Sequence, residues 1–79
     1  MNKQEFAMIA SGIKRFYNFD YVFPDKETVF AWASMLADID YKVMNLAVQK
    51  WVLTNPKPPT IADLRSMCAE VEQGTQLDY

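Results

Sequence analysis

Apolar residues recur at the spacing of an α-helix near both ends of the chain. They are, in order, Phe6, Ile9, Ile13 and Phe16, then Ile61, Leu64, Cys68 and Val71. Each series steps by three, four and three residues, which places its members on one helical face. Residues 18–24 show a brief alternation of apolar and polar side chains, but no other segment supplies a partner strand for a sheet. The pattern therefore predicts an all-α fold.

Capping residues mark two helix starts in the first half of the chain. Asn2 followed by Glu5 is a capping box, which predicts a first helix over residues 3–17. Asp25 caps a second helix, which we expect to end near Ala37. The apolar positions of this second helix are Val29, Trp32, Ala33 and Leu36.

Two further helices are predicted in the second half of the chain. Asp40 caps a third helix, and the prolines within residues 55–59 end it, because proline donates no backbone hydrogen bond. Thr60 and Asp63 form the capping pair of a fourth helix. Gly74 suits the left-handed residue that follows a helix end, so we expect the fourth helix to stop there.

The third helix is apolar around most of its circumference. Its polar members form only a narrow stripe, consisting of Lys42, Asn45, Gln49 and Lys50. A helix of this kind needs neighbours on most sides to cover its apolar side chains. We therefore expect the third helix at the centre of the fold.

A chain of 79 residues is long enough for one domain only. Hydrophobic residues make up 51% and charged residues 23% of it, which is typical of a globular protein. We predict a single helical domain over residues 1–74, followed by a frayed C-terminal end over residues 75–79. The expected architecture is a compact, irregular four-helix bundle with an extended aromatic loop between the first two helices.

Several residue types needed for catalysis or cofactor binding are missing. The chain has no histidine, one cysteine and two glycines. The commonest proton-transfer side chain is therefore absent, and neither a disulfide within the chain, a thiolate metal cluster nor a glycine-rich phosphate loop can form. We expect a protein that is not an enzyme and that binds no cofactor or metal.

The charge balance argues against phosphate-rich partners. The net charge is −2 and the isoelectric point is about 4.9, whereas nucleic-acid-binding domains usually carry an excess of basic residues. The longest apolar runs, residues 6–10 and 29–33, are far too short for a membrane span, and the N-terminus lacks the apolar run of a signal peptide. A lone cysteine fits a reducing compartment. We expect a cytoplasmic protein.

Three groups of residues have both a chemical and a structural interpretation. Asp38 and Asp40 could perform acid–base chemistry or hold a cation, but they flank a helix boundary, so helix capping is favoured. Glu70 and Glu72 belong to a solvated last turn. Cys68 has no basic partner to form a thiolate, and its helical spacing favours a buried structural thiol.

The loop between the first two helices carries the aromatic residues Phe19, Tyr21 and Phe23. All three rings could pack under the bundle as a lid on the core, which we favour because small domains need every ring. Alternatively, one or two rings stay exposed and anchor a partner protein. These three residues are candidate partner-binding residues. Lys57 and Arg65 are two further candidates.

A helix-turn-helix that binds DNA is a weaker interpretation of the fourth helix. The turn followed by Thr60 and the residues after it faintly resembles the start of a recognition helix. However, Arg65 is accompanied there by Asp63, Glu70 and Glu72, so that phosphates would meet net repulsion. Direct contact with nucleic acid is therefore not expected.

Residues 27–41 (ETVFAWASMLADIDY), followed by a helix and by residues 58–65 (PPTIADLR), resemble the phage replicative-helicase loader and inhibitor family. The opening Lys3-Gln-Glu-Phe and the aromatic stretch near Tyr17 also fit. The likeness extends from residue 3 to about residue 73, and residues 58–61 (PPTI) are its most specific part.

The resemblance implies a small all-helical domain from a bacteriophage replication module. Members of the family bind the hexameric replicative helicase, hold it inactive and help to deliver it to an origin through an initiator protein. They do not hydrolyse ATP themselves. They tend to continue into a polar C-terminal extension that contributes to helicase contact, whereas Tyr79 lies only a few residues after the fourth expected helix.

The expected function is that of a non-enzymatic adaptor of phage or prophage DNA replication. It would bind and restrain the replicative helicase and help to load it at the origin. The alternatives are a small DNA-binding, helix-turn-helix-like replication or regulatory protein, and a phage protein that inhibits an unrelated host enzyme through its aromatic loop.

Overall fold

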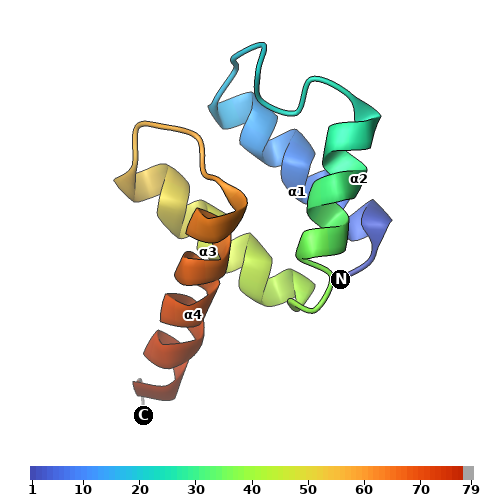
Figure 1. The fold of residues 1–79 in the computed structure, drawn as a ribbon. Helices are drawn as coiled ribbons and strands as arrows, with labels where there is room; N and C mark the ends of the chain where they lie inside the picture. The colour runs from blue at the N-terminus through green and yellow to red at the C-terminus, as the bar shows by residue number, and fades with distance from the viewer. Residues whose placement is uncertain (78–79) are drawn as a thin grey trace.

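The computed structural model describes residues 1–77 and contains four helices. They are α1 (Lys3–Phe16), α2 (Lys26–Met35), α3 (Tyr41–Thr54) and α4 (Ile61–Leu77), as labelled in Figure 1. No strand occurs in this part of the chain. The prediction of an all-α fold with four helices is therefore confirmed.

The helices form two hairpins that meet through α1 and α3. α1 packs against α2, α3 packs against α4, and α1 also packs against α3. In Figure 1 the C-terminal half of α4 extends beyond the other helices, and the two long loops lie together at the opposite end of the molecule. α3 thus has a helical neighbour on two sides.

Both predicted capping boxes are present. In α1, the Asn2 side chain accepts a hydrogen bond from the Glu5 N–H at 2.8 Å, and the Glu5 carboxylate accepts one from the Asn2 N–H at 2.9 Å. In α4, Thr60 and Asp63 make the same reciprocal pair at 3.0 and 3.1 Å. Each pair satisfies two backbone donors that a helix N-terminus leaves unpaired.

Aspartates start the other two helices, as predicted. The Asp25 carboxylate accepts hydrogen bonds from the backbone N–H and the hydroxyl of Thr28, both at 2.8 Å. Both bonds favour the ionised carboxylate and lower the pKa of Asp25. Asp40 accepts from the N–H of Lys42 at 3.0 Å and so caps α3.

Two of the expected helix ends are wrong. α2 ends at Met35 rather than near Ala37, because the N–H of Leu36 is shared between the carbonyls of Trp32 and Ala33 and the chain then turns. α4 passes through Gly74 and runs to Leu77. A glycine inside a helix costs only about 1 kcal/mol relative to alanine, so it need not end one. The frayed end predicted for residues 75–79 is helical as far as residue 77, and residues 78–79 lie outside the described part of the chain.

All four helices and the aromatic loop contribute to one core. The buried hydrophobic residues are Phe6, Ile9, Ala10, Ile13, Tyr17, Val22, Ala33, Leu36, Met44, Ala47, Val48, Trp51, Leu64, Met67 and Cys68. No polar or charged residue is buried with them in the described part of the chain. The burial of Cys68 confirms the prediction of a structural thiol.

Two expectations about burial are wrong. Phe16 was expected on the core face of α1, but its side chain is 65% exposed, and Tyr17, the next residue, is buried in its place. Neighbours were expected on most sides of α3, yet Leu46 and Leu53 are 51% and 84% exposed. The main neighbours of α3 are α1 and α4, which leave part of its circumference uncovered.

We expect the substitution Gly12→Ala to stabilise the protein. Gly12 lies inside α1, its φ angle is ordinary for a helix, and a Cβ placed there meets no other atom within 4 Å. Alanine should therefore gain about 0.5–1 kcal/mol in the free energy of unfolding, which urea denaturation measures. The reverse change at an exposed position of the same helix, Ala7→Gly, should lose a similar amount. An unchanged or lower stability of Gly12→Ala would contradict the explanation.

Candidate functional site

One lysine holds the loop between α1 and α2 in a defined shape. The Lys14 ammonium donates hydrogen bonds to the carbonyl oxygens of Phe19 at 2.9 Å and Val22 at 2.6 Å. The N–H of Val22 also donates to the carbonyl of Phe19. The loop is therefore a compact turn fastened to the last turn of α1, rather than the extended segment that the sequence led us to expect.

The three candidate aromatic residues of this loop have different environments. Phe23 is half-buried and makes edge-to-face contacts with Phe6 at 5.9 Å and Trp32 at 4.8 Å between ring centroids. Phe19 and Tyr21 are 46% and 70% exposed, and their rings stack on each other at 5.5 Å with planes 8° apart. The favoured prediction of core packing is right for Phe23 and wrong for Phe19 and Tyr21.

The backbone at Phe23 explains this division of the rings. Its φ angle is +47°, in the left-handed region that bulky residues rarely occupy. The proline at position 24 disfavours ordinary helical angles at Phe23, in agreement with the sequence. The left-handed turn directs the Phe23 ring into the core, and packing against Phe6 and Trp32 offsets a backbone cost of about 1–3 kcal/mol.

Two aromatic residues of the core hold the loop between α3 and α4. The Tyr17 hydroxyl donates to the carbonyl of Asn55 at 2.7 Å, and the Trp51 indole N–H donates to the carbonyl of Lys57 at 2.8 Å. Pro59, which belongs to this loop, is buried. Burial raises the pKa of Tyr17, so its hydroxyl remains a hydrogen-bond donor at neutral pH.

The two loops together form one surface, which we call the two-loop surface and define as residues 17–24 and 55–60. A cleft of about 240 Å³ lies between the loops and includes Tyr21, Phe23 and Pro58 in its lining. Lys57 is exposed next to Pro58. The structure thus brings four of the five candidate residues, all except Arg65, to the same end of the molecule.

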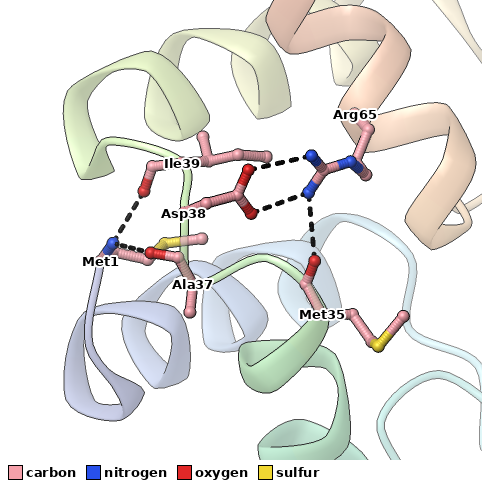
Figure 2. Close-up of polar contacts among 6 residues, drawn as sticks. All are labelled: Met1, Met35, Ala37, Asp38, Ile39 and Arg65. Carbon is pink, nitrogen blue, oxygen red and sulfur yellow. Dashed lines mark hydrogen bonds and ion pairs between the residues drawn. The ribbon is translucent and has the colours of Figure 1, made fainter.

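Arg65 lies elsewhere and has a structural partner (Figure 2). Its guanidinium makes two hydrogen bonds of 3.0 Å to the Asp38 carboxylate and a third, of 3.1 Å, to the carbonyl of Met35. On the other side of the same turn, the Met1 ammonium donates to the carbonyls of Ala37 and Ile39 at 2.8 and 2.7 Å. Both side chains of the pair between Arg65 and Asp38 are exposed, so the pair itself is accessible to a partner. The role of Arg65 in partner binding stays a prediction.

Three of the acidic and thiol candidates, Asp38, Asp40 and Cys68, have structural partners or burial in this arrangement. Asp40 is a cap, as predicted, whereas Asp38 pairs with Arg65 instead of capping a helix. Burial and the nearby Glu72 carboxylate raise the pKa of Cys68 to about 11, so the thiol is protonated at neutral pH. Within residues 1–77, no three His, Cys, Asp or Glu side chains are grouped closely enough to hold a metal ion, and no helix has the length and apolarity to cross a membrane.

These features define a small all-α domain whose two long loops form a fixed, partly aromatic surface. The family model for the N-terminal domain of the phage helicase loader and inhibitor matches residues 1–65. The chain therefore belongs to this family, as the resemblance indicated, and has a helicase-associated function. Comparison with curated proteins and with solved structures finds no match.

Sequence reasoning missed the residues that hold the two-loop surface in place. Lys14 was assigned no role, and neither Tyr17 nor Trp51 was assigned a polar contact. The available signal was the position of two aromatic residues whose side chains carry a hydrogen-bond donor. Tyr17 directly follows α1 and Trp51 lies in the last turn of α3, so each stands just before a loop.

We expect alanine substitutions to separate the inner ring from the two outer ones. Phe23→Ala should lower the free energy of unfolding by about 2–3 kcal/mol, because it removes a half-buried ring and its contacts with two others. Phe19→Ala and Tyr21→Ala should each change it by less than about 0.5 kcal/mol. Thermal denaturation of the three variants measures the difference. Equal losses at all three positions would contradict the assigned environments.

The pair between Asp38 and Arg65 should make stability depend on pH. The hydrogen bonds from Arg65 hold the pKa of Asp38 below its ordinary value near 3.8. A lowered folded-state pKa contributes stability above the unfolded-state value, and this contribution is lost as the pH falls through the folded-state value. Asp38→Asn should therefore melt at a lower temperature than the parent at neutral pH, and the gap should close well below pH 3.8.

Asp20→Asn, in the exposed part of the aromatic loop, is the matched control for this titration. It should show no gap at neutral pH. A difference between Asp38→Asn and the parent that stays constant across the whole pH range would contradict an ionic origin.

Proposed function

We propose that this protein is a non-enzymatic adaptor of phage DNA replication. It binds the hexameric replicative helicase, restrains it, and helps to deliver it to the origin with a phage initiator protein, in the cytoplasm of the bacterial host. The observation that carries this proposal is the family match over residues 1–65, which includes both loops of the two-loop surface.

The mechanism we propose is occupancy rather than chemistry. A bound protein shifts a helicase toward an idle state only by the difference between its affinities for the idle and the translocating state. A tenfold shift needs about 1.4 kcal/mol of such a difference, which a few well-placed side chains supply. The thiol of Cys68, buried and protonated, and the carboxylates that serve as caps are consistent with this mechanism.

The two-loop surface supplies the contact in this proposal. Phe19 and Tyr21 present two stacked rings to solvent, and aromatic side chains are frequent among the residues that dominate binding energy. Lys14 holds their loop before any partner arrives, so little conformational entropy is lost on binding. Lys57 adds one exposed positive charge beside the rings.

The DNA-binding alternative receives no support from the fourth helix. Arg65 is the one basic residue between Ile61 and Leu77, and its guanidinium is already hydrogen-bonded to Asp38. The one cation of this helix therefore already has a carboxylate partner.

We expect the replicative helicase of the same phage or host to retain this protein, measured by pull-down and by calorimetry, with and without nucleotide. The double variant Phe19→Ala/Tyr21→Ala should bind at least tenfold more weakly with an unchanged melting temperature. Leu46→Ala/Leu53→Ala is the matched control, because it removes two apolar side chains of α3 that are together at least as exposed as Phe19 and Tyr21.

Two results would count against the proposal, and they are distinguishable. Absence of binding in both nucleotide states would overturn the helicase as partner of these residues. Binding that is equally strong in the parent and in the loop variant would overturn the two-loop surface as the contact while leaving the partner intact.

A further inference from the structure

A groove runs between α1 and α2 and shares only Phe23 with the two-loop surface. Its volume is about 680 Å³, and it is open to solvent along its length. The apolar part of its lining comes from Ala7, Ala10, Phe23, Val29 and Phe30. The small side chains on α1 leave room for another backbone to approach, and the rings come from the aromatic loop and α2.

The charged residues that line this groove all carry the same sign. They are Lys3, Lys14, Arg15 and Lys26, and no carboxylate lines the groove with them. The chain has eight basic and ten acidic residues, so half of its positive side chains gather at this one feature of an acidic protein. Such a concentration against the net charge makes a local field that favours a negatively charged partner.

The one ion pair in the described part of the chain joins Arg65 and Asp38. None of the four cations of the groove is therefore paired with a carboxylate there. The Lys3 ammonium lies 5.2 Å from the centroid of the Phe30 ring. The Lys14 ammonium donates to two neutral carbonyls, which leave its charge in place. The positive charge around the groove is therefore available to a partner.

The shape of the groove matches a helix. Its lining on α1 extends from Lys3 to Arg15, which is about 18 Å along a helix axis, or little more than three turns. Helices pack about 8–10 Å apart, at the short end when small side chains face the contact, as Ala7 and Ala10 do here. The cations lie at both ends of this length, with Lys3 in the first turn of α1 and Arg15 in the last.

We propose that the groove between α1 and α2 binds an acidic amphipathic helix of a partner protein. Apolar side chains of that helix occupy the floor formed by Ala7, Val29 and Phe30. Its Asp and Glu side chains meet Lys3 and Arg15 at the two ends. Attraction between these cations and the carboxylates fixes the orientation of the helix, and burial of its apolar stripe supplies most of the affinity.

An apolar floor favours this occupant over a nucleic acid or a membrane. A sugar–phosphate backbone has nothing to bury against Val29 and Phe30, and a flat bilayer surface does not enter a concave groove between two helices. This inference goes beyond the helicase proposal, since it concerns a second face and does not depend on the identity of the first partner.

The test is selection of peptides from a displayed library of random peptides, about 16 residues long to match the length of the groove, on the immobilised full chain. The enriched peptides should carry apolar residues at helical spacing, flanked by Asp and Glu. The affinity of a selected peptide should fall at least tenfold in the double variant Lys3→Glu/Arg15→Glu. Lys42→Glu/Lys50→Glu is the matched control, because it makes the same charge change at two exposed positions of α3 and should bind as the parent does.

A second variant tests the floor of the groove without changing its charge. In Ala7→Trp the indole ring occupies the floor of the groove, so the affinity for the selected peptide should fall at least tenfold. Because Ala7 is exposed, the melting temperature should stay that of the parent. Equal affinity of the selected peptide for the parent and for both groove variants would overturn the proposal. So would enrichment of neutral or basic peptides, or no enrichment. Binding of phosphatidylglycerol vesicles or single-stranded oligonucleotides through Lys3 and Arg15, with no acidic peptide bound, would also overturn it.

Discussion

The packing of α1 against α3 is the constraint on which the rest of the structure depends, because it is the main helix–helix contact that joins the two helical hairpins into one core. Polar contacts fasten this junction at both ends. At one end the Tyr17 hydroxyl reaches the carbonyl of Asn55, and at the other the Met1 ammonium and Arg65 hold the turn between α2 and α3 (Figure 2). Each contact joins residues at least 27 positions apart, so together they fix the two hairpins relative to each other.

Local features of the fold could be predicted from the sequence, because neighbours along the chain create them. The capping boxes of Asn2 with Glu5 and of Thr60 with Asp63 form within one helical turn, and both were predicted correctly. The exposure of Phe16 could not be predicted, since Phe16 and Tyr17 compete for one place in the core. That competition is decided by a carbonyl 38 positions away, on Asn55.

The candidate site shows the same limit. The sequence identified the aromatic loop. The exposure of Phe19 and Tyr21, however, depends on the hydrogen bonds from Lys14 to the loop and on the left-handed backbone at Phe23. The cationic groove was not anticipated, because Lys3, Lys14 and Arg15 are spread along α1 and only the pairing with α2 adds Lys26 and the apolar floor beside them. A net charge of −2 conceals such an asymmetry.

Lys14 belongs to both faces of the molecule, since it lines the groove while its ammonium holds the carbonyls of Phe19 and Val22. A carboxylate that reached this ammonium from the groove would compete with those two carbonyls for its protons. Occupancy of the groove would then change the order of the aromatic loop, and by thermodynamic reciprocity a ligand on the loop would change the affinity of the groove by the same factor. A single ammonium group thus gives a domain of this size the means to couple two binding events.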